Sequence, residues 1–194
     1  GIIVGYRGLG GVVGFGLTLM IGRWDPRIGM SIGFGLLVVS GLWLMSLDLN
    51  AGVNLLLANS VLQGVAVGII WVPLTVMTFG DLTIRDTPEG MSVFHLLRNI
   101  GSSLFISLSV TEILRSGTMN YSRMMEMLSP YNRALLWPST MGGWEMETAQ
   151  GLARLSREVD RQAAMIGHLN AFGMYMAVSG IAILFVLLVR GKRR

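Results

Sequence analysis

Three polar side chains fall close together inside a long apolar stretch in the middle of the chain. His95 precedes Arg98 by three positions and Asn99 by four, so a helix would bring all three to one face. Counted from Gly90, Arg98 lies about two turns in, at a depth of roughly 12 Å, where a charge costs about 2.5–3.5 kcal/mol on insertion scales. We therefore expect Arg98 to face a protein interior or a water-filled cavity, and the three residues to be candidates for a substrate or proton pathway.

Arg98 and His95 each have a structural alternative. Arg98 fits an anchor at the start of its helix, where it would pair with Asp81 or Asp86 or snorkel to the interface. The His95 ring can titrate near neutral pH, as a proton carrier must, but a buried, hydrogen-bonded histidine explains it as well. Both interpretations stay open for each residue.

Two more pathway candidates lie in other apolar stretches. Arg7 is about two turns into the first stretch, where it either lines an outward-facing mouth or snorkels. Trp71 is in the middle of the third stretch, where it either packs or faces a cavity. Neither alternative is settled by the sequence.

The elements that would position these residues are membrane-spanning helices. Hydrophobic residues make up 52% of the 194 and charged residues only 13%, against about 25% in typical soluble domains. A span needs roughly 20 mainly apolar residues, and five stretches qualify: 1–21, 28–47, 54–79, 91–114 and 168–189. The sequence predicts an all-α, polytopic membrane protein with four spans in 1–114, a long, partly helical external loop at 115–167, and a last span with a basic tail at 168–194.

Loop charge sets the expected orientation. Arg23, Arg27 and the basic residues after 189 fall on one side, while the connection 47–52 contains neither Lys nor Arg. The positive-inside rule places the first group in the cytoplasm, together with the C-terminus. The long loop carries arginines as well, but long loops cross the membrane largely regardless of charge.

Two further motifs have packing interpretations. The turn Gly22-Arg23-Trp24-Asp25-Pro26-Arg27 is similar to the G-R-x-x-D-R loop motif of major facilitator transporters, in which charges link neighbouring helix ends. An ordinary positive-inside turn is the alternative. In the third stretch, Gly64 and Gly68 form a small-xxx-small face that allows close helix packing, and Pro73 permits a bend. Packing alone also explains that pattern.

Longer strings carry a more specific resemblance. The run Gln63-Gly64-Val65-Ala66-Val67-Gly68-Ile69-Ile70-Trp71-Val72-Pro73-Leu74 resembles the Q/R-G-x-x-x-G-x-x-x-x-P-L run of drug:proton antiporters of the EmrB/QacA type, which belong to the major facilitator superfamily. The string from Met91 to Leu104 resembles the next span of that family. The resemblance covers nearly the whole chain and corresponds to the last five of fourteen spans.

This resemblance implies part of a proton-coupled exporter of toxic, amphipathic and often cationic small molecules, working by alternating access in a bacterial inner membrane. Its expected partners are membrane lipids, the preceding spans of the same transporter and a periplasmic adaptor protein. A non-transporting membrane scaffold, or a subunit of another complex, is the alternative. The first residue is Gly1 rather than Met, so we expect a piece of a longer protein.

Other function classes lack support in the sequence. There is no cysteine, and His95 and His168 lack metal-ligand spacing, so no metal or cofactor is expected. Ser179 lacks the glycine pattern of an intramembrane serine protease, and no glycine-rich phosphate loop follows a strand, so we expect no enzyme. No basic stripe interleaved with aromatic residues suggests nucleic acid.

Overall fold

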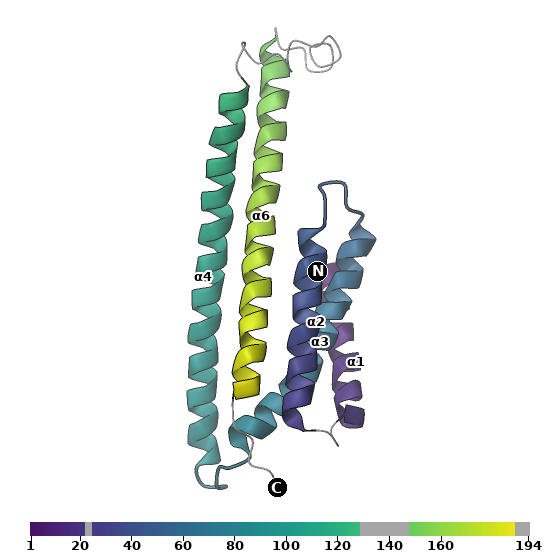
Figure 1. Cartoon of the computed structure of the whole chain (residues 1–194), viewed down its shortest axis with the longest axis vertical. Coiled ribbons are helices and arrows are strands. Elements are labelled where there is room, and N and C mark those ends of the chain that lie inside the picture. Colours follow the sequence, from purple (N-terminus) through teal and green to yellow (C-terminus); the bar gives the residue numbers. More distant parts are fainter. Residues whose placement is uncertain (22–24, 129–147, 189–194) are drawn as a thin grey trace. The chain divides into compact units, whose positions relative to one another are not determined.

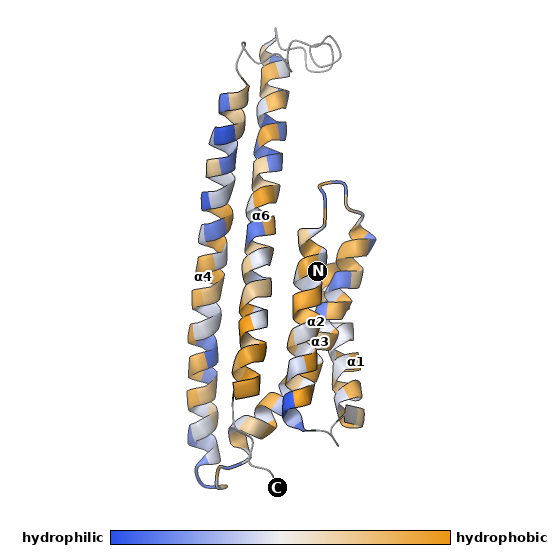
Figure 2. Cartoon of the chain, viewed as in Figure 1, coloured by the Kyte–Doolittle hydropathy of each residue, from blue (hydrophilic) through white to orange (hydrophobic). Residues whose placement is uncertain are grey.

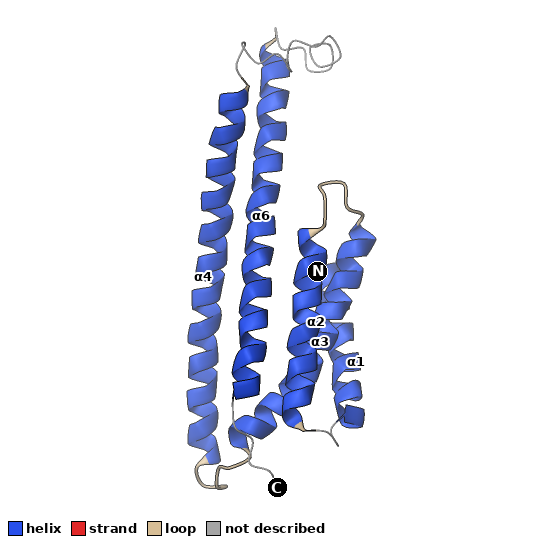
Figure 3. Cartoon of the chain, viewed as in Figure 1, coloured by secondary structure: helices blue, strands red, loops and turns tan. Residues whose placement is uncertain are grey.

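The computed structural model describes residues 1–21, 25–128 and 148–188, and these residues form helices and short connections without a strand (Figures 1 and 3). The helices are α1 (Ile2–Ile21), α2 (Pro26–Met45), α3 (Val53–Phe79), α4 (Thr87–Met127) and α6 (Ala149–Leu188). Each is long and apolar enough to cross a membrane. The predicted all-α architecture with five membrane-length helices is confirmed.

Local sequence signals mark the starts of α2 and α3. Pro26 occupies the first turn of α2, where its missing N–H removes no helix hydrogen bond. Gly52 precedes α3 in an extended conformation. α1 and α2 have 20 residues each, and α3 has 27, so they measure about 30 to 40 Å along their axes. These lengths match the hydrocarbon thickness of a bilayer.

The chain divides into two compact units, residues 1–104 with 172–194 and residues 105–171, which are described separately below. In the first unit, α3 packs against both α1 and α2, and a small apolar core forms around Leu37, Ala66 and Ile70. Contacts at Gly41–Met176 and Met45–Gly173 place the end of α6 antiparallel to α2. The contacts of Gly10 with Gly64 and of Gly14 with Gly68 show that α1 and α3 run parallel, as the first and third of successive membrane crossings must.

Glycines bring the backbones of α1 and α3 into direct contact. A Cβ added at Gly64 would fall on the carbonyl oxygen of Arg7, and one added at Gly68 would lie 2.5 Å from the carbonyl oxygen of Gly11. From the other side, a Cβ at Gly14 would fall on the carbonyl oxygen of Val65. Two small-residue faces thus fit into each other, the packing mode by which membrane helices associate without a hydrophobic driving force.

A buried polar cluster joins α2 to α3. Asn59 is 1% exposed and Ser40 is 0% exposed. The Ser40 Oγ donates to Asn59 Oδ1 at 3.0 Å, the Asn59 Nδ2 donates to the Ser40 carbonyl at 3.1 Å, and the Gln63 Nε2 donates to the same Oδ1 at 3.0 Å. Because water cannot replace these partners inside a bilayer, the cluster fixes the register between the two helices.

The second unit is an antiparallel helical hairpin. Gly117 lies against Ala163 and Gly167 against Ile113. The Asn170 Nδ2 donates to Ser116 Oγ at 2.6 Å. Further along the two helices, the Tyr121 hydroxyl and the Ser156 hydroxyl form a hydrogen bond of 3.1 Å. Figure 2 shows hydrophilic residues on these stretches of α4 and α6, next to the grey connection.

The two long helices extend beyond the spans expected from hydropathy. α4 has 41 residues and α6 has 40, so each measures about 60 Å, roughly twice the hydrocarbon thickness. The spans were expected over 91–114 and 168–189 with a partly helical loop between them, and the helices continue from both spans into that loop, to Met127 and from Ala149. Polar side chains that pair across the hairpin allow the helices to continue where apolar character ends. The centre of the predicted loop, with Pro130 and Pro138, lies outside the described residues.

Candidate functional site on one flank of α4

The start of α4 packs antiparallel to the end of α3. A Cβ added at Gly90 would contact the Leu82 side chain just after α3. One turn on, the rings of Phe94 and Phe79 meet edge to face with centroids 5.4 Å apart. Gly90, Phe94 and Arg98 are spaced four residues apart, so a single face of α4 lies along α3. This face positions the next contact.

Arg98 lies over the ring of Trp71, with its guanidinium carbon 4.9 Å from the ring centroid. Such a cation–π contact contributes about 0.5–1 kcal/mol at exposed sites and about 2 kcal/mol when desolvated. Arg98 is eleven residues from Thr87, about 16 Å along the helix, and Trp71 is eight residues, about 12 Å, from Phe79. The structure therefore brings two of the sequence candidates together, several turns from the ends of α3 and α4 that face the connection between them.

His95 and Asn99 lie beside Arg98 on the same side of the helix, and their side chains are exposed. Ser102 follows Asn99 by three positions and is also exposed, its Oγ donating to the Asn99 carbonyl at 3.0 Å. We call His95, Arg98, Asn99 and Ser102 the polar flank of α4. Sequence inspection missed Ser102, although its spacing from His95 and Asn99 was a usable signal.

The opposite side of α4 is apolar and equally open. Val93, Leu97, Ile100 and Leu104, the apolar flank, are 55%, 64%, 49% and 61% exposed. The apolar flank of this helix is suited to contact with lipid, whereas the polar flank is not, because polar and charged groups are costly in hydrocarbon. In the described part of the first unit, Trp71 stacks on Arg98 and the Phe94 ring lies edge to face against His95 with centroids 5.7 Å apart, while all four side chains of the polar flank remain exposed.

Arg7 belongs to a different helix contact. Its backbone carbonyl lies against Gly64, and its side chain is exposed. Pro73 lies inside α3 and is buried against Gly29 of α2. Gln63, Gly64 and Gly68 belong to the helix contacts already described rather than to the polar flank.

The turn before α2 is described only in part, since Gly22 and Arg23 lie outside the described residues. The Asp25 side chain is exposed and makes no capping hydrogen bond with α2. Among the described residues, Arg27 and Ser31 hold polar atoms without a hydrogen-bond partner: Nε and Nη2 of the half-buried Arg27 and Oγ of Ser31. The sequence suggested only a loop charge for Arg27, although Ser31 follows it by one helical turn and brings a second polar group to the same side of the helix.

No arrangement of described residues fits a metal, because no three His, Asp or Glu side chains gather within 1–21, 25–128 and 148–188.

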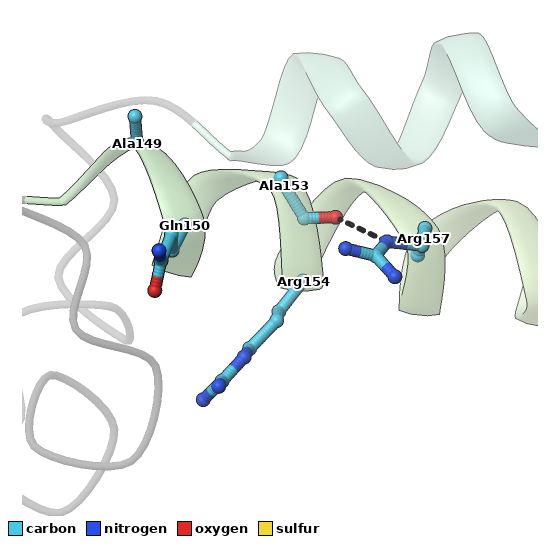
Figure 4. Close-up of a pocket in the computed structure, with 5 residues that line it drawn as sticks. All are labelled: Ala149, Gln150, Ala153, Arg154 and Arg157. Carbon is cyan, nitrogen blue, oxygen red and sulfur yellow. Dashed lines mark hydrogen bonds between the residues drawn. The ribbon is translucent and has the colours of Figure 1, made fainter.

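The structure also has an open hollow at the start of α6, lined by Ala149, Gln150, Ala153, Arg154 and Arg157 (Figure 4). Arg154 extends away from the helix, while Arg157 turns back so that its Nε donates to the Ala153 carbonyl at 3.3 Å. All five residues come from one helix and all five are exposed, so the hollow is a surface feature rather than a built site.

Comparisons with known proteins point in one direction. The chain is 24% identical over 129 residues to the multidrug export protein EmrB of Haemophilus influenzae, covering 66% of this chain and 25% of that protein. It is 22% identical over 125 residues to EmrB of Escherichia coli K12, covering 62% of this chain and 24% of that protein. The chain thus spans about a quarter of the length of these curated relatives.

Two other comparisons gave no match. No protein-family model matches the chain. No solved structure matches it either. The five apolar helices and the EmrB similarity together identify a multi-pass membrane protein that is distantly similar, over about two thirds of its length, to multidrug export proteins.

Proposed function

We propose that this chain is the C-terminal part of a proton-coupled exporter of toxic, amphipathic small molecules. The observation that carries the proposal is the polar flank of α4, which lies on a membrane-length helix and whose four side chains are exposed. Polar and charged side chains inside a membrane almost always face a bundle interior or a water-filled cavity. The distant similarity to multidrug export proteins supports a cavity of the transporting kind.

The proposed mechanism is alternating access, in which two halves of a transporter rock about a central cavity while proton binding biases the inward and outward states. The polar flank forms part of one cavity wall. The contact of α1 with α3 holds that wall as a rigid piece, because backbones in direct contact leave little freedom to slide. His95 is the proton-carrying candidate on the flank, since histidines inside membranes commonly belong to proton relays.

The proposed setting is a bacterial inner membrane with a cytoplasmic C-terminus. The connection between α2 and α3 has Asp48 and no basic residue, whereas Arg27, Arg85 and the basic tail fall on the other side. The positive-inside rule assigns that other side to the cytoplasm. The outer part of the helical hairpin in 105–171 then lies outside, where it would contact a periplasmic adaptor protein. The preceding spans of the same transporter would close the cavity.

The direct test is dye efflux by the natural full-length protein in everted membrane vesicles, energised by a proton gradient. Efflux should stop when an uncoupler collapses the gradient. Arg98→Ala should lower the efflux rate by roughly tenfold, the loss expected when a charged contact of about 1.4 kcal/mol is removed. Arg85→Ala, an exposed cation in the loop before α4, is the matched control and should retain wild-type efflux.

Two outcomes would contradict the proposal or its site. Full efflux by Arg98→Ala at normal expression would remove Arg98 from the pathway. No gradient-dependent efflux of any amphipathic dye by the unaltered protein would favour a non-transporting membrane scaffold.

A further inference from the structure

We infer that Arg98, held in place by Trp71, selects the charge of the compounds that bind along the polar flank and disfavours organic cations relative to anions of similar shape. The inference rests on the proposed exporter function for its biological meaning. Its structural basis is the contact of 4.9 Å between the guanidinium and the indole ring. It departs from the expectation, drawn from family resemblance, of often cationic compounds.

Trp71 is the positioning residue of this pair. A long basic side chain inside a membrane span tends to reach along its helix toward the nearest interface. The ring of Trp71 instead attracts the guanidinium carbon to a fixed point on α3. The planar group then has one face occupied while its N–H donors at the edges stay free to bind an anionic or polar group. The positive charge is thereby held in place.

The surrounding helices do not neutralise that charge. In the described part of the first unit, α3 has no charged residue and α1 has only Arg7. α2 adds only Arg27, and residues 172–188 of α6 add none. Before residue 105, α4 adds one acid, Glu89, in its first turn. The other described acids of this unit, Asp25, Asp48, Asp81 and Asp86, lie in the connections between helices, so no acid stands beside Arg98 within α1, α2, α3 or residues 172–188. A positive charge without an opposite charge beside it attracts anions and repels cations.

The aromatic surface itself supports the same preference. A tryptophan face is the best protein surface for stacking an organic cation. Here Arg98 already occupies the face of Trp71, so an incoming cation would have to displace a covalently tethered competitor. An incoming anion would instead meet the free edges of the guanidinium. Neutralising Arg98 should reverse both effects together.

The test compares two fluorescent compounds of matched size and opposite charge, measured as equilibrium binding to the purified full-length protein. The readout is the ratio of the two dissociation constants, which cancels general losses of folded protein. Arg98→Gln should shift this ratio toward the cation by roughly tenfold or more, given the interaction of unit charges a few ångströms apart. Arg85→Gln removes the same charge from an exposed loop position and should leave the ratio unchanged.

Variants at tryptophans separate the positioning role from the charge itself. Trp71→Leu should move the ratio in the same direction as Arg98→Gln but by less, because the charge remains while its anchor is lost. Trp71→Phe should restore most of the wild-type ratio, since a phenyl ring also attracts a cation. Trp43→Leu is the matched control, because Trp43 is a half-buried tryptophan of α2 and, among the described residues, the cation stacks on Trp71 instead. An Arg98→Gln ratio equal to that of Arg85→Gln would overturn the inference.

Efflux of the same two compounds distinguishes this inference from the proposed function. A shifted binding ratio without gradient-driven efflux of either compound would preserve the charge-selecting pair and contradict the exporter. Gradient-driven efflux with an unshifted ratio in Arg98→Gln would preserve the exporter and contradict the pair.

Discussion

The α1–α3 contact and the polar flank of α4 are two membrane-helix surfaces built on opposite principles. In the α1–α3 contact, glycines have no side chains, so the two helix backbones touch directly, and Gly10, Gly14, Gly64 and Gly68 are all buried. In the second, exposed polar side chains project from a helix, with ring contacts only at Arg98 and His95 among the described residues of the flank. The difference indicates where stability and function separate. Changes in the closed surface should unfold the protein, and changes in the open one should alter binding.

The largest effect on stability is expected at the glycine contact. Gly64→Ala places a methyl group on the carbonyl oxygen of Arg7, so α1 and α3 must separate. We expect the free energy of unfolding to fall by about 2–3 kcal/mol, as in overpacked cores. Thermal unfolding in detergent measures it, with Gly8→Ala as the control, since nothing lies within 4 Å of a Cβ at that position. Equal melting temperatures for the two variants would show that the contact is not closed.

The buried cluster between α2 and α3 comes next. Asn59→Ala leaves the Ser40 hydroxyl and carbonyl without their partner in the helix contact. Unsatisfied buried groups cost about 1–3 kcal/mol, and the free energy of unfolding should fall by that amount. Asn54→Ala, at an exposed position in the first turn of α3, is the matched control. If both variants unfold alike, the cluster does not stabilise the helix pair.

The hairpin of 105–171 should show a smaller effect. Ser116→Ala removes the acceptor of the Asn170 amide, and the expected loss is about 1 kcal/mol. Hydrogen exchange of the backbone amides of α4 between residues 105 and 127 would report it as faster opening. Ser122→Ala is an exposed control on the same helix. Unchanged exchange in Ser116→Ala would mean that apolar packing alone holds the hairpin.

The smallest effect on stability is expected on the polar flank. Arg98→Gln loses a contact with Trp71 worth less than about 1 kcal/mol at an exposed position, so the melting temperature should barely change. Thermal unfolding of the variant used for binding measures this directly. A loss as large as that of Gly64→Ala would show that Arg98 is a structural anchor, the alternative that its sequence position left open.

Hydropathy predicted the five membrane-length helices, but not how far two of them continue. The apolar signal stops near residue 114, whereas helix formation needs only backbone hydrogen bonds and a partner. Ser116 and Asn170 supply that partner across the hairpin. A hydropathy window cannot detect polar groups that pair with residues more than fifty positions away.

The sequence predicted which residues of α4 share one side of the helix, but not which residue of α3 they contact. Helical spacing places His95, Arg98 and Asn99 on one side, because the period is a property of a single segment. The stacking of Arg98 on Trp71 depends on the register between α3 and α4, which the Phe79–Phe94 contact helps to set. Register is a property of two packed helices, and no local pattern in either one specifies it.

Cysteine accessibility tests the central claim, that the polar flank of α4 lines a water-accessible path, most directly. The 194 residues contain no cysteine, so single cysteines can be placed without background from this chain. Cysteines at 95, 99 and 102 should react in native membranes with a water-soluble maleimide, and cysteines at 93, 97, 100 and 104 should not. Labelling of both flanks alike, or of the apolar flank alone, would contradict the account.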